Sequence, residues 1–333
     1  MDIDFVIAWV DGNDKKWIEE KNKYDTNIDL TEDKNESRYR EWDNLQYWFR
    51  GVEKYASWVH KIYFLTWGHI PKWLDTSNEK LVIVKHTDYI PNEYLPTFNS
   101  HTIELNMHRI KGLSEHFVYF NDDMFLTKEV SPLDFFSEDG LPKDTFALDA
   151  IYFAPDSAGA YNGNDLEIIN KYFNKDIQFK KFAKSKFFKK EYGLKNLYRT
   201  IVLNRWHWFP GFKYDHLPSS FLKQTFEIIW EKEFDILDAT CKDKFRSKRN
   251  VNQWLFKYWQ LASGNFSPRT YKFGLVFHLK EFPNNKLKEA IETNKFSMIC
   301  INDTSKTTNF EQHKEMVKTS FNKILPNKST FEK

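Results

Sequence analysis

Cysteine and long apolar runs are both scarce in this chain of 333 residues. The two cysteines, Cys241 and Cys300, are far apart and lack the spacing of metal ligands, which disfavours a disulfide scaffold or a zinc site and fits a reducing compartment. No apolar run reaches the roughly 18 residues that a membrane span needs, and residues 1–5 lack a secretion-signal pattern. We therefore expect a folded cytoplasmic protein, with a peripheral position at the inner face of the membrane as an alternative.

Several catalytic motifs and any strong net charge are also absent. The sequence has no glycine-rich phosphate loop, no Gly-x-Ser-x-Gly elbow and no His-Glu-x-x-His helix. Its net charge is only +2, which provides no electrostatic basis for nucleic-acid binding, and we expect no nucleic-acid partner. Aromatic residues, in contrast, make up 18% of the chain. This content predicts a large core or an aromatic-lined cleft.

The hydrophobic pattern alternates between short strands and amphipathic helices. We predict strands over residues 5–10, 61–66, 81–84 and 116–121, and helices from residue 43 and over 99–110, with a loop over 20–41. This order is typical of a doubly wound α/β fold. Further along, we predict helices from Ser219 or Ser220, over 251–261 and over 310–325, and a late strand over 296–301. Without repeats or linkers, 1–333 is predicted to be one catalytic domain: an α/β half (1–150), a mostly helical insertion (151–235), and helices with a late strand that complete the site (236–333).

The most informative segment is the apolar strand that ends in Asn121, Asp122 and Asp123. Two adjacent carboxylates repel each other and resist desolvation, so they need water, a positive side chain or a metal ion nearby. In an α/β sheet the carboxyl ends of the strands are also where ligands bind. Polar residues follow the other predicted strands as well: Asp11, Asp14, Thr66 and His86. The pattern favours a site at this edge over an ordinary polar turn.

The predicted helix over 99–110 has two faces. His101, Glu104 and His108 share one face at about 100° per residue, and Ile103 and Met107 share the opposite one. The apolar face is expected to pack on the sheet. The polar face is either solvated or points Glu104 into the cleft beside Asp123.

Residues 171–195 combine nine lysines with five phenylalanines. A basic and aromatic stretch of this kind can lie on an anionic membrane surface or recognise an anionic acceptor. The alternative is an ordinary solvated helical insertion whose phenylalanines enter the core.

The remaining candidate groups are carboxylates, one loop histidine (His216) and arginines that include Arg246. Carboxylate oxygens suit Mg²⁺ or Mn²⁺, and Mg²⁺ usually binds through one or two carboxylates together with substrate phosphates. A cation and an arginine can hold charge while a histidine moves a proton. These residues indicate a metal-dependent enzyme that acts on a nucleotide-sugar or a phosphate ester.

Four blocks of the sequence carry a family resemblance. They are residues 3–14, residues 38–125, residues 209–260, and Ile301 to Thr304 with the helix that follows. In this order they resemble the four conserved regions of the Stealth family of sugar-1-phosphate transferases, which includes bacterial capsule and cell-surface polysaccharide enzymes. The resemblance implies a Rossmann-like, GT-A-like nucleotide-sugar-binding sheet, with 1–150 as the nucleotide-binding half.

The resemblance also implies a reaction. An acceptor hydroxyl of a glycan or lipid-linked oligosaccharide attacks the phosphorus of a UDP-sugar that bears the sugar. UMP leaves, and a sugar-1-phosphate ends up in a phosphodiester. The alternatives are a metal-dependent GT-A glycosyltransferase that releases UDP, or a non-catalytic subunit of a polysaccharide assembly complex.

Roles are carried onto individual residues by the same resemblance. The residues expected to be catalytic are Glu104, Asp123, His216 as the base and Arg246 as the charge-neutralising group. Those expected to hold Mg²⁺ or Mn²⁺ are Asp122, Asp123 and Asp303. Those expected to bind substrate are Asp11, Gly12, Asp14, His101, Arg109 and Asn121. The plain alternatives are a turn role for His216, a surface charge at Arg246 and a helix cap at Asp303.

Overall fold

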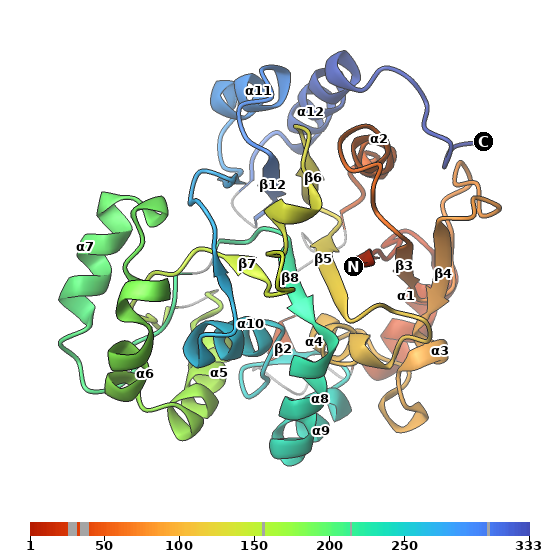
Figure 1. Ribbon diagram of the computed structural model, residues 1–333. Coiled ribbons are helices and arrows are strands. Elements are labelled where there is room, and N and C mark those ends of the chain that lie inside the picture. The colour runs from red at the N-terminus through yellow and green to blue at the C-terminus, as the bar shows by residue number, and fades with distance from the viewer. Residues whose placement is uncertain (26–31, 34–39, 155–156, 214, 305–306) are drawn as a thin grey trace.

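The computed structural model describes residues 1–25, 32–33, 40–154, 157–213, 215–304 and 307–333. Its centre is a five-stranded sheet in the order β4-β3-β1-β5-β8 (Figure 1). These strands are β1 (Ile3–Ala8), β3 (Ile62–Thr66), β4 (Leu81–Lys85), β5 (His116–Asn121) and β8 (Ser219–Leu222). The first four are parallel, and β8 pairs antiparallel with β5. The predicted α/β fold class is therefore confirmed.

The strand order places a topological switch point between β1 and β5. The chain adds β3 and β4 on one side of β1 and then crosses to place β5 on the other side. In an open α/β sheet, ligands bind in the crevice beyond the carboxyl ends of the strands at such a point. Ala8 pairs with Asn121 on one side and with Leu65 on the other, so the three strands end at the same edge.

Both faces of the sheet are buried, which explains the nearly continuous apolar strands. Along β5, Val118 and Phe120 belong to one hydrophobic cluster and Phe117 and Tyr119 to the other, as the alternation of a strand requires. The first cluster includes α2 (Leu45–Tyr55), α11 (Asn285–Glu292) and α12 (Phe310–Ile324). The second includes α4 (Ser100–Leu105), α5 (Gly159–Tyr172), α8 (Lys223–Lys232) and α10 (Trp254–Ser263). The two sets of helices lie on opposite sides of the sheet (Figure 1).

A second, three-stranded sheet brings the late part of the chain to the end of β5. It consists of β11 (Gly274–His278), β12 (Met298–Asn302) and β6 (Met124–Leu126), in the order β11-β12-β6. The backbone N–H of Ile301 donates to the carbonyl of Asp123 at 2.8 Å. The predicted late strand is thus β12, and it ends beside the paired carboxylates.

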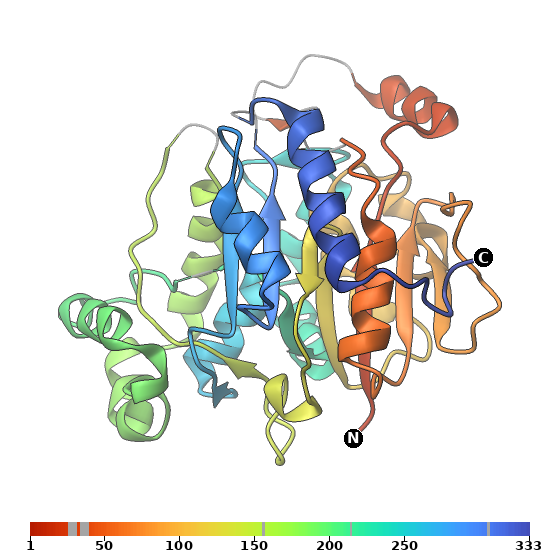
Figure 2. The ribbon, with the colours of Figure 1, turned by 90° about the horizontal axis from the view of Figure 1, so that it is seen from above.

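The helical segment over residues 159–203 lies to one side of the central sheet (Figures 1 and 2). It contains α5, α6 (Lys175–Phe182), a π-helical turn (Ala183–Phe187) and α7 (Leu194–Leu203). Phe179 and Phe187 are buried, and the ring of Phe187 stacks on Phe146 with centroids 4.2 Å apart. These phenylalanines therefore enter the core.

Three predicted elements differ from the structure. The helix expected from Ser219 is wrong at its start, because Ser219–Leu222 pairs with β5 as a strand before α8 begins. The loop expected over 20–41 is wrong at its start, because helix α1 extends over Lys15–Tyr24. This helix is capped by Asp14, whose side chain accepts from Trp17 N–H at 2.9 Å. The rest of that loop lies mostly outside the described residues. The helix expected over 99–110 ends at Leu105 and is followed by a 3₁₀ turn, Met107–Arg109.

The remaining short elements connect these layers. They are β2 (Glu32–Asp33), α3 (His86–Tyr89), β7 (Lys143–Asp144), α9 (Phe234–Lys242), β9 (Arg246–Ser247), β10 (Ser267–Pro268), and 3₁₀ turns at Asn92–Tyr94, Pro132–Asp134 and Lys190–Tyr192. Across the described ranges, none of the helices combines the length and apolar character needed to cross a bilayer.

Candidate active site

Polar groups line the carboxyl edge of the sheet in the order of the strands. His86 follows β4, His69 follows β3, Asp11 follows β1, and Asn121 ends β5. The backbone N–H of Asp11 donates to His69 Nε2 at 2.8 Å. Burial, together with the nearby His69, lowers the pKa of His86 to about 3. These contacts join the ends of neighbouring strands into one polar edge.

The centre of this edge is a group of four side chains: Asn121, Asp123, His216 and Cys300. Asn121 Nδ2 lies 2.7 Å from His216 Nε2, and His216 Nε2 lies 3.9 Å from Asp123 Oδ1. The thiol of Cys300 donates to Asp123 Oδ2 at 3.2 Å. Three segments distant in sequence meet here: the end of β5, the loop before β8 and strand β12.

The amide of Asn121 bears on the proton state of His216. With the amide nitrogen as the donor in this contact, Nε2 accepts through its lone pair and the ring proton lies on Nδ1. This is the form of imidazole that a general base needs. A second histidine, His278, lies nearby. Its pKa is lowered, mainly by burial and then by the charge of His216. His278 Nδ1 in turn is 3.1 Å from Asn302 Nδ2.

Asp122 extends the acidic character of the edge. Desolvation, with repulsion from Asp123 and Glu41, raises its pKa to about 7. Because Asp122 as a whole residue is exposed, water weakens the desolvation but leaves the repulsion between the carboxylates. The pKa of Glu41 is also raised, first by burial and then by carboxylates that include Asp11. A positive ion or ligand at this edge would relieve this repulsion.

The described residues contain one possible metal-binding triad, formed by Asp123, His216 and Cys300 with ligand atoms all within 4.8 Å of one another. Asp123 Oδ1 is buried and accepts no hydrogen bond, so one carboxylate oxygen is available to a cation. A carboxylate with an imidazole suits Mn²⁺ at least as well as Mg²⁺, and a thiolate ligand would favour a softer ion. Burial raises the pKa of Cys300, and the charge of Asp123 raises it further. In the metal-free protein, Cys300 therefore keeps its proton.

Asp303 lies just beyond β12 and outside this triad. Its Oδ2 is 3.5 Å from Arg40 Nη1, and its charge acts on the buried His313. Asp303 thus follows the strand that pairs with the Asp123 backbone through Ile301, but its side chain pairs with an arginine. It does not act as the cap of α12, where Asn309 is the N-cap residue.

Glu104 lies beneath the site and is only 6% exposed. Tyr119 Oη donates to Glu104 Oε1 at 3.4 Å, and Tyr119 is also close enough for the charges of Asp122 and Asp123 to raise its pKa. Burial raises the pKa of Glu104 to about 8. The solvated-face alternative for the helix over 99–110 is wrong, because the second core cluster covers this face as well and His101 and His108 are also buried.

Arg246 belongs to a second group of residues around the start of α4. Its guanidinium donates to Ser100 Oγ, with Nε at 3.0 Å, and Ser100 is the first residue of α4. The next residue, His101, packs edge-on against Tyr161 with ring centroids 4.7 Å apart. Arg246, His101 and Glu104 therefore come together through α4, and Tyr119 connects this group to the carboxylates of β5.

The predicted nucleotide loop follows β1 directly. Asp11 Oδ1 accepts from Asn13 N–H at 2.9 Å, which shapes the turn that contains Gly12. Asp14 caps α1, so one of its oxygens is already used by the backbone. Arg109 is not brought to the site. It is exposed, its guanidinium lies 4.8 Å from the ring centroid of Trp230, and it stands in the turn that leads to the opposite end of β5.

Sequence reasoning missed four neighbours of the site: Glu41, His69, His278 and Cys300. His69 follows the end of β3 as Asp11 follows β1, so the strand-end pattern could have identified it. Cys300 lies inside an apolar strand, so its sequence context is that of an ordinary core cysteine. Nothing in the local sequence of Glu41 or His278 indicates a shared location.

Solved structures with a similar arrangement include the galactosyltransferase LgtC in complex with donor and acceptor sugar analogs, at a TM-score of 0.37 and 10% identity over 95% of each chain. Another is the apo-form glycosyltransferase GlyE of Streptococcus pneumoniae TIGR4, at a TM-score of 0.43 and 10% identity, covering 98% of this chain and 62% of that one. Similarities of this size carry no argument about fold or function.

Sequence relatives are much closer. Residues 1–29 match the model for Stealth protein CR1, conserved region 1, and residues 38–144 match that for Stealth protein CR2, conserved region 2. The chain is 46% identical to a capsular polysaccharide phosphotransferase WcwK of Streptococcus pneumoniae and 45% identical to the receptor polysaccharide phosphotransferase WefC of Streptococcus gordonii, each over 99% of this chain and 98% of the relative. It is 41% identical to the exopolysaccharide phosphotransferase cps2G of Lactiplantibacillus plantarum, over 100% and 96%. With this identity over nearly its whole length, the chain belongs to the Stealth protein family.

Proposed function

We propose that this protein is an enzyme that transfers a sugar-1-phosphate from a UDP-sugar to a hydroxyl of a glycan. The product is a phosphodiester, UMP is released, and the reaction serves capsular or exopolysaccharide synthesis. The observation that carries the proposal is the group of Asn121, His216 and Asp123 at the switch point of the sheet, in a chain whose relatives are named polysaccharide phosphotransferases.

His216 takes the proton of the acceptor hydroxyl in this proposal. Its Nε2 lies 2.7 Å from the Asn121 amide and 3.9 Å from Asp123 Oδ1, and the acceptor hydroxyl would replace the amide at this nitrogen. As the proton moves to Nε2, the hydroxyl oxygen forms a bond to the phosphorus that bears the sugar. The bond from that phosphorus to the bridging oxygen breaks, and UMP carries away the electron pair. The bond between the sugar and its phosphate stays intact.

A divalent cation fits the donor set on the β5 edge. Mg²⁺ or Mn²⁺ would neutralise the diphosphate of the donor, with Asp123 as the first ligand and Asp122 beside it. Asp303, the third ligand that the family resemblance implies, would have to exchange Arg40 for the cation.

The residues around α4 have supporting roles. Arg246, held by Ser100, would neutralise charge on the transferred phosphoryl group. With a pKa of about 8, Glu104 is protonated at neutral pH and acts on the site through the hydroxyl of Tyr119. Asp11, Gly12 and Asp14 would shape the nucleotide pocket beyond β1, together with His101 at the start of α4. The position of Arg109 does not support its predicted role in substrate binding.

The acceptor in this proposal is a glycan or a lipid-linked oligosaccharide. An acceptor on a lipid carrier would bring a cytoplasmic enzyme to the inner face of the membrane.

The experiment that tests the proposal identifies the nucleotide product. The purified protein is incubated with UDP-sugars and an oligosaccharide acceptor in Mn²⁺ or Mg²⁺, with the Asp123→Asn variant as the control. Acceptor-dependent UMP that the variant does not form supports phosphotransfer. UDP as the product would make the protein a glycosyltransferase. No turnover by the wild-type protein with any donor, or equal turnover by the variant, would favour a non-catalytic role for this site.

A further inference from the structure

Helix α7 (Leu194–Leu203) buries its polar side and exposes its apolar side. Its fully buried side chains are Asn196 and Thr200, both polar. Asn196 Nδ2 donates to the carbonyl of Tyr192 at 2.9 Å, and Thr200 Oγ1 accepts from the backbone N–H of Leu148 at 3.1 Å. The inward side of α7 is therefore held by these hydrogen bonds and by Leu197 and Leu203, which are partly buried against the second core cluster.

The outward face of α7 is an apolar stripe formed by Leu194, Tyr198, Ile201 and Val202. Their exposed fractions are 86%, 70%, 54% and 42%, respectively. The spacing of four and then three residues places Leu194, Tyr198 and Ile201 in one row along the helix. Isolated exposed apolar residues need no explanation, but a continuous row on one helix indicates a partner.

Two exposed tryptophans follow α7 closely in the sequence. Trp206 is 55% and Trp208 is 53% exposed, and both line an open depression of about 590 Å³ beside α5. At the other end of α7, Leu194 shares a smaller hollow with Tyr271 and Lys272. Tryptophan and tyrosine are the side chains that favour the boundary between water and lipid.

The same region carries a strong positive charge. Residues 171–208 contain eleven Lys and Arg and only two Asp and Glu, whereas the whole chain has a net charge of +2. Some of these charges are paired, such as Lys171 with Glu233 and Arg199 with Asp149. The exposed lysines next to the stripe include Lys180, Lys181, Lys184, Lys190 and Lys195. An apolar stripe with flanking lysines matches a surface of anionic lipid head groups over an apolar interior.

We propose that α7 with Trp206 and Trp208 is a membrane-docking surface that lies on an anionic lipid bilayer. The apolar stripe enters the head-group region and the lysines contact lipid phosphates. A second copy of this chain is disfavoured as the occupant, because the two basic surfaces would repel each other. The surface is built from different residues than the transfer site, and the proposal does not depend on the transfer chemistry.

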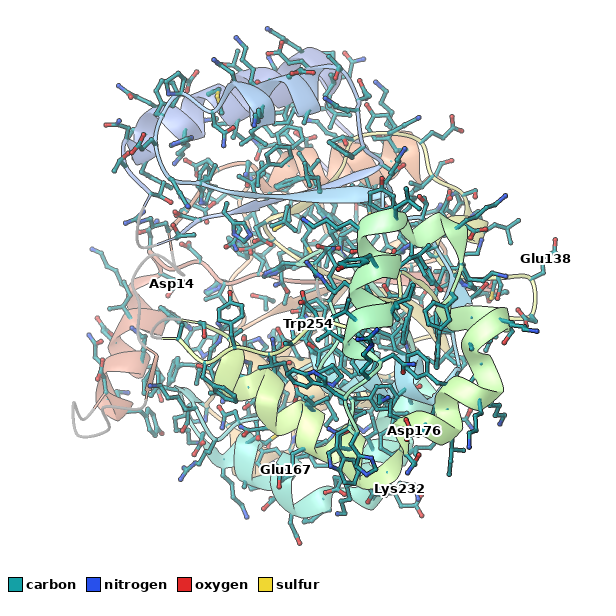
Figure 3. All side chains as sticks on the ribbon, turned by 90° about the vertical axis from the view of Figure 1, so that its left-hand side faces the viewer. Asp14, Glu138, Glu167, Asp176, Lys232 and Trp254 are labelled. Atoms are coloured by element: carbon teal, nitrogen blue, oxygen red, sulfur yellow. The ribbon has the colours of Figure 1, made fainter. Side chains whose placement is uncertain are left out.

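The position of α7 leaves the candidate active site accessible. Figure 3 looks onto the side that carries α6 and α7, with Asp14 of the β1 loop toward one end of the view and Asp176 of α6 toward the other. Figure 2 shows α7 projecting from the side of the molecule. A bilayer against α7 therefore does not cover the edge at which the strands end.

The test measures cosedimentation of the full-length protein with vesicles of phosphatidylglycerol and phosphatidylcholine and with vesicles of phosphatidylcholine alone. We expect binding to the anionic vesicles that weakens with added salt. The triple variant Leu194→Ser, Tyr198→Ser, Ile201→Ser should lose at least tenfold in the partition coefficient. The variant Lys180→Gln, Lys184→Gln, Lys190→Gln should lose about fivefold per lysine.

Control variants replace exposed residues elsewhere. Leu133→Ser with Leu275→Ser controls for lost apolar surface, and Lys72→Gln with Lys286→Gln and Lys288→Gln controls for lost charge. Both controls should bind as the wild type does, and circular dichroism should show the same fold for every variant. The proposal is overturned if the wild type ignores anionic vesicles, if the α7 variants bind as well as the controls, or if sedimentation velocity shows a dimer that the α7 triple variant abolishes.

Discussion

Glu104→Gln isolates the effect of one buried carboxyl group on stability. Glu104 is 6% exposed, and burial raises its pKa from the ordinary value of 4.5 to about 8. Glutamine has nearly the same shape as the protonated acid but cannot release a proton. The free energies of unfolding of the two proteins should therefore diverge as pH rises.

The sign and the size follow from the two pKa values. Between pH 4.5 and 8 the folded wild type holds a proton on Glu104 that the unfolded chain has released, so its stability falls with rising pH by about 1.4 kcal/mol per unit. Integrated from pH 5 to pH 8, this amounts to about 3.5 kcal/mol. Every other group titrates in both proteins, so the variant should gain about 3.5 kcal/mol relative to the wild type across this range.

Urea unfolding of both proteins at pH 5, 6, 7 and 8, followed by circular dichroism, measures the difference. The buffers should contain a chelator, because a bound cation would change the titration of Asp122 and Asp123. A difference in unfolding free energy that is the same at pH 5 and pH 8 would refute the reasoning. It would mean that Glu104 ionises in the folded protein as it does in water.

Three further predictions concern the site and the packing of the chain end. Asp123→Asn should lower the turnover rate by roughly 10³-fold while the melting temperature changes little, as initial rates and thermal unfolding would show, because it removes charge from the proposed cation ligand. Asn121→Asp places a carboxylate about 2.7 Å from His216 Nε2, so the acid limb of the kcat/KM profile should move up by roughly one pH unit or more, and an unchanged profile would remove His216 from the role of base. Arg50→Met breaks two hydrogen bonds to Glu332, of 2.7 and 2.8 Å, and leaves this buried carboxylate short of a partner. It should lower the urea-derived free energy of unfolding by roughly 3 kcal/mol, and a loss below about 1 kcal/mol would contradict this.

Much of the central sheet could be predicted from the sequence. The four predicted strands of the first half correspond to β1, β3, β4 and β5, because both faces of the sheet are buried and each strand is a short apolar run bounded by polar turns. The same pattern located the carboxyl edge, since a parallel sheet brings successive strand ends to one side.

Strand β8 could not be predicted in the same way. Its four residues, Ser219–Leu222, are followed directly by α8. The helical pattern of the sequence therefore begins about one turn before the helix does. Only pairing with β5, which is about a hundred residues away in sequence, selects the strand. Tertiary pairing outweighs local propensity at such short segments.

The residues of the site that follow strand ends could be predicted from the sequence. The burial of side chains by layers that pack over a helix or strand could not. Helical periodicity placed His101, Glu104 and His108 together correctly, but it carries no information on the layer that packs over them. Cys300 reaches Asp123 only because β12 pairs with β6, a contact between segments far apart in the chain.

In the proposed reaction the phosphate that bears the sugar is transferred together with it. A donor UDP-sugar labelled with ³²P at the phosphate next to the sugar tests this directly, with an oligosaccharide acceptor and Mn²⁺. Transfer of a sugar-1-phosphate predicts that the label enters the glycan product and that the released nucleotide is unlabelled UMP. Label that stays entirely in released UDP, with an unlabelled glycosylated product, would contradict the account.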